Sequence, residues 1–241
     1  MQTPLPYPRI IAHRCGGALA PENTLPGLDI AARLGCRGVE FDIMLSQDAV
    51  PFLIHDETLA RTTNSAGAVA TTGSDALATV DAGMRHHKAY AGTALPRFDD
   101  ALARCAALGL WANVEIKPSS GAETATGDAV ARRLSRWRGR GIASSFSLDA
   151  LRAARKASPS LPMAVLFERL PANWRRSVDE LRALAVHLAA RHVDEGVAEA
   201  LRGVPWACYT VNSRDEAARL FALGASAIFT DRPDQWAVAE M

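Results

Sequence analysis

The sequence has few cysteines, no long apolar run and almost no excess charge. Its 241 residues include four cysteines with no C-x-x-C spacing, so a zinc or redox site of that kind and a secreted disulfide framework are not expected. No apolar run approaches the roughly 20 residues of a membrane span, and no signal-peptide pattern opens the chain. A formal net charge of +1 offers no overall field for nucleic acid or an acidic membrane. We therefore expect a cytoplasmic protein with reduced thiols, no nucleic-acid partner and no stable membrane association.

The chain has the length and hydrophobic content of one α/β barrel. Hydrophobic residues make up 49% of it, and short apolar runs alternate with amphipathic helical segments. Nine runs resemble strands: 9–12, 38–43, 51–55, 111–116, 142–146, 163–167, 183–188, 206–211 and 226–230. Helix signals lie between them, such as a cap at Asn23 or Thr24 and a capping box from Ser213 to Glu216.

Nine strands are one too many for a barrel of eight, and the second connection explains the excess. Residues 46–49 are far too few for a parallel crossover. Run 51–55 is therefore predicted to return antiparallel around a turn near 47–48, which would set Glu40 roughly opposite His55. The eight remaining runs predict a (β/α)8 TIM-type barrel.

The stretch 56–96 fits no barrel unit, because it is rich in small and polar residues and lacks long apolar periodicity. We interpret it as an excursion that packs over the carboxyl ends of the strands. The predicted organisation is one α/β domain spanning 1–241, with a small insertion at about 44–96 after the second barrel strand.

The second strand carries two carboxylates at alternating positions, Glu40 and Asp42. Alternation on a strand places both on one face and Val39, Phe41 and Ile43 on the other. Two like charges on a buried face are costly unless a cation pairs with them, and a divalent metal is the simplest such partner.

Other polar side chains follow the strands at the same level, where barrel active sites lie. His13 and Arg14 follow the first run, His55 ends the antiparallel return, and Glu115 and Lys117 end the run at 111–116. Oxygen ligands without cysteine favour Mg²⁺ or Ca²⁺. Arg14 and Lys117 suit a phosphate, and two histidines beside it suit a general base and a general acid. Strand-end positions also make Phe146 and Tyr209 candidates for the pocket wall.

These residues belong to ordered motifs that resemble the glycerophosphodiester phosphodiesterase family. The motifs are HR-x-G-x-x-x-x-PENT, VEFD, IHD followed by RTTN, VEIKP, SSF, YTVN and TDRP, from about residue 9 to about residue 233. The cytosolic bacterial glycerophosphoryl diester phosphodiesterases resemble the chain most. The resemblance implies a TIM-type barrel, a divalent metal, and hydrolysis of glycerophosphodiesters such as glycerophosphocholine to sn-glycerol 3-phosphate and an alcohol.

Site residues carry over onto matching motif positions. The resemblance implies catalytic roles for His13 and His55, metal binding for Glu40, Asp42 and Glu115, and phosphate contacts for Arg14 and Lys117. We expect His13 to act as the base and His55 as the acid.

Three departures from the family pattern stand out. Cys15 replaces a usual glycine, and Tyr209 replaces a common tryptophan. Met84-Arg85-His86-His87 stands where the family tends to carry serine and aromatic residues. Because this segment belongs to the insertion, its sequence bears on the preferred leaving group.

Two other readings stay open from the sequence. A related metal-dependent lipase, of the phospholipase C or lysophospholipase D type, would share the histidines and carboxylates. A non-catalytic barrel that binds phosphorylated ligands would require the loss of one of them, and none is missing. The oligomeric state, including a homo-oligomer, is also left open.

Overall fold

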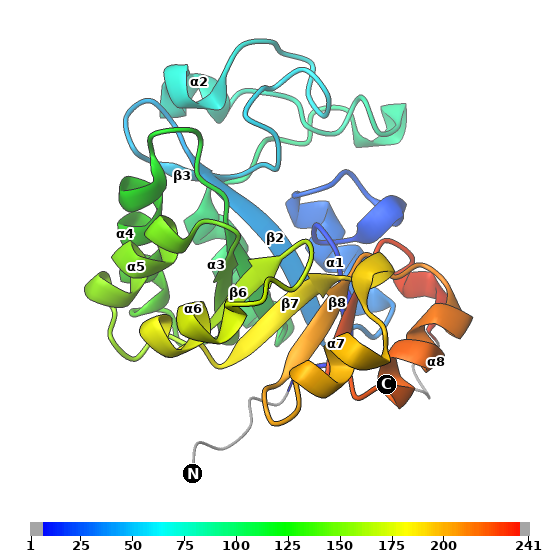
Figure 1. The fold of residues 1–241 in the computed structure, drawn as a ribbon. Coiled ribbons are helices and arrows are strands. Elements are labelled where there is room, and N and C mark those ends of the chain that lie inside the picture. The colour runs from blue at the N-terminus through cyan, green and yellow to red at the C-terminus, as the bar shows by residue number, and fades with distance from the viewer. Residues whose placement is uncertain (1–6, 237–241) are drawn as a thin grey trace.

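The computed structural model describes residues 7–236, whose strands form a closed parallel barrel (Figure 1). The barrel strands are β1 (Ile10–Ala12), β2 (Gly38–Leu45), β4 (Trp111–Ile116), β5 (Arg140–Ser145), β6 (Met163–Phe167), β7 (Ala185–Ala189), β8 (Trp206–Tyr209) and β9 (Ala227–Thr230). Each pairs in parallel with its neighbours, and β1 closes the ring by pairing with both β2 and β9. The predicted eight-stranded barrel is therefore confirmed.

Helices surround the barrel and bury their apolar faces against the strands (Figure 1). They are α1 (Leu25–Arg33), α3 (Phe98–Leu108), α4 (Glu123–Leu134), α5 (Leu148–Ala157), α6 (Trp174–Leu181), α7 (Glu195–Ala200) and α8 (Arg214–Ala222). Thr24 is the N-cap of α1, and the Ser213 hydroxyl accepts a hydrogen bond from the Glu216 N–H at 3.5 Å, as the capping signals predict. None of the helices in residues 7–236 is long and apolar enough to cross a bilayer.

The return strand β3 (Pro51–Leu53) pairs antiparallel with β2, as predicted. The predicted register was wrong by one position. With Glu40 opposite His55, Ile43 would pair with Phe52, whereas it pairs with Leu53. The connection is a five-residue loop, 46–50, in which Ala49 adopts a positive φ of 62°. An odd loop centred on residue 48 shifts the register by one relative to a two-residue turn.

The insertion, residues 46–97 between β2 and α3, has a small apolar cluster of its own. It contains β3, α2 (Ser74–Leu77) and the 3-10 turns η2 (Val69–Thr71) and η3 (Lys88–Tyr90). Phe52, Leu59 and Leu77 are fully buried in this cluster beside Met44 of β2. Figure 1 places the insertion at the end of the barrel toward which β2 runs. The Tyr90 hydroxyl donates to the carbonyl of Leu19 at 3.3 Å, which ties the insertion to the loop after β1.

The barrel interior is filled below the mouth by apolar side chains. Ile11, Trp111, Ile142 and Phe229 form one buried cluster together with four alanines of the later strands. On β2, Val39, Phe41 and Ile43 instead join the core beneath the helices. The apolar cluster therefore closes the barrel below the mouth. All four cysteines are buried free thiols.

Candidate active site

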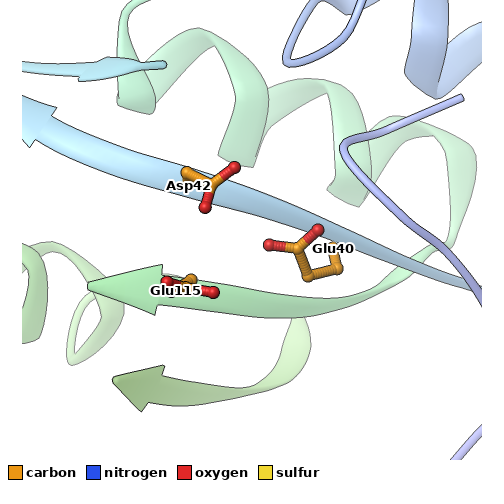
Figure 2. A group of neighbouring side chains, drawn as sticks. All are labelled: Glu40, Asp42 and Glu115. Atoms are coloured by element: carbon orange, nitrogen blue, oxygen red, sulfur yellow. The ribbon is translucent and has the colours of Figure 1, made fainter. Parts of the chain in front are cut away.

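Three buried carboxylates lie side by side on β2 and β4 (Figure 2). Asp42 pairs directly with Glu115 in the parallel ladder, and Glu40 lies one alternation earlier on the same face of β2. One oxygen from each of the three lies within 4.8 Å of the others. The exposed fractions are 3% for Glu40, 1% for Asp42 and 9% for Glu115, so water does little to screen their repulsion.

The cluster has the donor set of a hard divalent cation. The Oε1 atom of Glu40 is buried and has no hydrogen-bond partner within residues 7–236. Its Oε2 accepts the backbone N–H of Arg14 at 2.8 Å. Burial, followed by repulsion from Asp42, raises the pKa of Glu115 to about 7 and raises that of Glu40 well above its usual range. A site that disfavours its own charges in this way fits Mg²⁺ or Ca²⁺.

Asn23 holds Asp42 in place by two hydrogen bonds. The Asn23 Nδ2 donates to Asp42 Oδ2 at 2.9 Å, and its Oδ1 accepts the backbone N–H of Asp42 at 3.0 Å. Asn23 is buried and has a positive φ of 56°, a conformation that asparagine tolerates better than most residues. The PENT motif thus fixes the orientation of one member of the carboxylate cluster.

Two cations border the carboxylates. Lys117 Nζ lies 3.3 Å from Glu115 Oε1 and 3.8 Å from Asp42 Oδ1, and these carboxylates raise the pKa of Lys117 although burial works against its charge. Arg14 Nε lies 3.9 Å from Asp42 Oδ2, while its Nη1 donates to Glu22 at 3.0 Å. Both side-chain cations lie beside the carboxylates, so they would contact a phosphate held at this cluster.

His13 is supported by a carboxylate from the opposite end of the chain. Its Nδ1 lies 2.7 Å from Asp231 Oδ1, and Asn212 Nδ2 donates to Asp231 Oδ2 at 3.0 Å. Although burial opposes it, the hydrogen bond from His13 lowers the pKa of Asp231, so this carboxylate is ionised and only accepts. The proton of neutral His13 therefore lies on Nδ1, and Nε2, which lies 3.8 Å from Glu40 Oε2, is left for chemistry.

His55 has the same support from its sequence neighbour. Its Nδ1 lies 2.7 Å from Asp56 Oδ1, and Arg61 donates to both oxygens of Asp56 at 2.5 and 2.9 Å. The Arg61 guanidinium lowers the pKa of the Asp56 carboxyl. Burial lowers the pKa of His55 itself, against the opposing effects of Asp42 and of the hydrogen bond to Asp56. Arg61 also bonds Glu22 at 2.7 Å, which links the insertion to the PENT loop.

The inner cavity, of about 190 Å³, is the space that joins these groups. All nine residues singled out from the sequence line it: His13, Arg14, Glu40, Asp42, His55, Glu115, Lys117, Phe146 and Tyr209. Phe146 is 47% exposed, and its ring packs edge-on against Tyr209 at 5.9 Å. The Tyr209 hydroxyl donates to the carbonyl of Phe167 at 2.9 Å, which holds this aromatic wall in place.

The floor of the inner cavity is neutral. His187 of β7 is fully buried, its Nε2 lies 3.0 Å from the Tyr7 hydroxyl, and burial lowers the pKa of His187 to about 3. Asn113 also lines the cavity, and its Nδ2 donates to Ser144 Oγ at 2.9 Å. The charged chemistry is therefore confined to the mouth above this floor.

Four polar residues of the site were not assigned a role from the sequence: Asp56, Arg61, Asn212 and Asp231. Asp56 and Arg61 stand inside the IHD and RTTN motifs, and Asn212 and Asp231 end the YTVN motif and open the DRP turn. Their motif positions were a usable signal, but their partners are set by the closed barrel.

Comparisons with known proteins identify the family of the chain. The model of the Glycerophosphoryl diester phosphodiesterase family matches residues 13–235. A glycerophosphodiester phosphodiesterase of Caldanaerobacter subterraneus is 27% identical over 230 residues, covering 93% of this chain and 94% of the relative.

Two solved structures extend the likeness to the fold. A phosphodiesterase of Oleispira antarctica, in complex with the product sn-glycerol-3-phosphate, is 30% identical with a TM-score of 0.91, covering 95% of this chain and 94% of that one. A glycerophosphodiester phosphodiesterase of Agrobacterium tumefaciens is 27% identical with a TM-score of 0.75, covering 95% and 98%.

Proposed function

This chain belongs to the glycerophosphoryl diester phosphodiesterase family, and from that premise we propose that it hydrolyses glycerophosphodiesters to sn-glycerol 3-phosphate and an alcohol. The observation that carries the proposal is the lining of one cavity by three carboxylates, two cations and two histidines. Each histidine has an aspartate on Nδ1, which leaves both Nε2 atoms for proton transfer. The product bound by the Oleispira antarctica phosphodiesterase supports the same chemistry.

A divalent cation would be held by Glu40, Asp42 and Glu115, since the lone Oε1 of Glu40 and the mutual repulsion of the three carboxylates fit such an ion. When bound, the ion supplies Lewis-acid polarisation of the phosphoryl group. Mg²⁺ and Ca²⁺ both suit oxygen ligands.

The chain's own residues bind and orient the substrate. Arg14 and Lys117 hold the phosphodiester and neutralise the charge that builds on its oxygens. The edge-on pair of Phe146 and Tyr209 packs against the glycerol carbons, because it forms the apolar wall of the inner cavity.

The two histidines move the protons. His13 takes the proton of the glycerol 2-hydroxyl, which attacks phosphorus from close by and forms a cyclic phosphate. The bond from phosphorus to the second alcohol breaks, and His55 protonates that alcohol. Water then opens the ring with the two roles reversed, which releases sn-glycerol 3-phosphate. The position of His13 Nε2 near Glu40 supports its assignment as the base.

A panel of substrates tests the proposal. Glycerophosphoglycerol, glycerophosphocholine and lysophosphatidylcholine would be incubated with the enzyme, and binding of each would be measured by calorimetry. Glycerol 3-phosphate released from the two water-soluble diesters would be measured enzymatically, and choline or phosphocholine released from the lysophospholipid by mass spectrometry. We expect release from the water-soluble diesters. Turnover of the lysophospholipid alone would favour the lipase reading, and binding without turnover would favour the non-catalytic one.

The free thiols suit a reducing compartment, so the proposal includes the cytoplasm.

A further inference from the structure

A second, larger hollow lies beside the inner cavity. This outer cavity has a volume of about 530 Å³ and lies between the loop after β1 and the insertion, which contributes Arg61, Arg85 and His86 to its lining. His13 and Arg14 line both cavities. A phosphodiester held at Arg14 with its glycerol in the inner cavity would therefore extend its other ester arm into the outer one.

The carboxylates of the outer cavity are already occupied. Glu22 accepts from Arg14 at 3.0 Å and from both terminal nitrogens of Arg61 at 2.7 Å. Asp231 is bound to His13 at 2.7 Å. Neither carboxylate is therefore left to attract a cationic alcohol.

Arg85 is the cation in this lining that lacks a counter-charge. Arg61 is shared between Glu22 and Asp56, whereas Arg85 forms no ion pair with any residue from 7 to 236. Its Nε donates to the carbonyl of Thr63, which fixes the guanidinium and leaves its two terminal nitrogens as donors.

The segment that carries Arg85 is held firmly. The Asp81 carboxylate accepts the backbone N–H groups of Gly83 and Met84 at 2.8 and 2.9 Å, and that of Gly92 at 2.8 Å. A Cβ on Gly83 would lie 2.0 Å from the carbonyl oxygen of Tyr90, so only glycine permits this close packing. The position of Arg85 in the wall is thus set by its surroundings.

Quaternary ammonium groups are recognised in proteins by aromatic faces and by carboxylates. No Phe, Tyr or Trp of the described chain lines the outer cavity. Resting on the proposed phosphodiesterase activity, we propose that the outer cavity holds the leaving alcohol and prefers one that carries an anionic group, such as a phosphate monoester. Arg85 is the residue that determines this preference.

Three diesters with the same glycerol arm test the proposal. Their second alcohols are glycerol 3-phosphate, glycerol and choline, so they carry an anionic, a neutral and a cationic leaving group. We expect kcat/KM to fall in that order, and the advantage of the anionic arm over the neutral one to shrink as salt is added. Equal values for all three, or the highest value for the choline diester, would overturn the inference.

Substitutions of Arg85 test whether this residue determines the preference for an anionic leaving group. Arg85→Met should reduce the ratio of kcat/KM for the anionic over the neutral diester about tenfold or more, since a charge-assisted hydrogen bond is lost. Arg85→Lys should retain part of the ratio. Lys88→Met is the matched control, because it removes an exposed positive charge three residues away that lines neither cavity.

The ratio separates recognition from folding, because a general structural defect lowers turnover of both diesters equally. An unchanged ratio in Arg85→Met would overturn the role of Arg85. Absence of glycerol 3-phosphate from all three diesters would instead refute the proposed function and this inference with it.

Discussion

Replacing Glu115 by glutamine should stabilise the metal-free protein above neutral pH. The pKa of Glu115 is raised from an ordinary 4.5 to about 7 by burial and by Asp42. The folded state therefore binds this proton more tightly than the unfolded state does. As a result, the stability of the wild-type protein falls as pH rises from about 4.5 to about 7. At about 1.4 kcal/mol per pH unit, the charged carboxylate costs on the order of 3 kcal/mol above this window.

Glutamine removes that cost. The attraction of Lys117 is already included in the pKa of about 7, so its loss needs no separate deduction, and the net gain is about 3 kcal/mol. For a chain of this size the gain corresponds to roughly 6–12 °C in Tm. The gain should be small near pH 4.5, where the folded carboxyl is protonated and the unfolded one is about half protonated, and should vanish at lower pH.

The assay is thermal unfolding of chelator-treated protein between pH 4.5 and 8. Glu57→Gln is the control, because that carboxylate is exposed and lies outside the cluster. Saturating Mg²⁺ or Ca²⁺ should raise the wild-type Tm and have a smaller effect on Glu115→Gln. A variant less stable than the wild type at pH 8 without metal would refute the account of a strained carboxylate cluster.

The remaining predictions concern catalysis. His13→Ala and His55→Ala should each lower kcat by about 10²–10⁴. A diester with a p-nitrophenol leaving group should restore turnover only in His55→Ala, because p-nitrophenolate leaves without protonation by an acid. Restored turnover in His13→Ala instead would exchange the two roles. Asp231→Asn should lower kcat about tenfold or more with little change in KM, because the Nδ1 proton of His13 loses its acceptor; unchanged kcat would make Asp231 merely structural. A 2-deoxy diester should bind and yet turn over far more slowly, whereas equal turnover would exclude the cyclic phosphate.

Local patterns made much of this protein predictable. The alternation of Glu40 and Asp42 with apolar residues depends only on strand geometry, and the structure has both carboxylates facing the barrel mouth. The short connection after β2 required an antiparallel return for the same kind of reason. The register of that return depended on the type of turn, which residues 46–50 do not reveal on their own.

Long-range pairing was the part that could not be predicted. His13 and Asp231 are 218 positions apart and meet because β1 closes the barrel against β9. The backbone conformation at Cys15 was equally hidden: its φ is 76°, in the left-handed region that suits the usual glycine. A hydrogen bond from the Cys15 N–H to the carbonyl of Glu40, at 2.7 Å, holds the loop against β2.

The most direct test of the account is the release of glycerol 3-phosphate from glycerophosphoglycerol before chelation, after removal of divalent ions, and after their return. The account predicts that turnover is lost with the ions and restored by Mg²⁺ or Ca²⁺, and that Glu40→Gln abolishes the restoration. Turnover that persists after exhaustive chelation, or a product other than glycerol 3-phosphate, would contradict it.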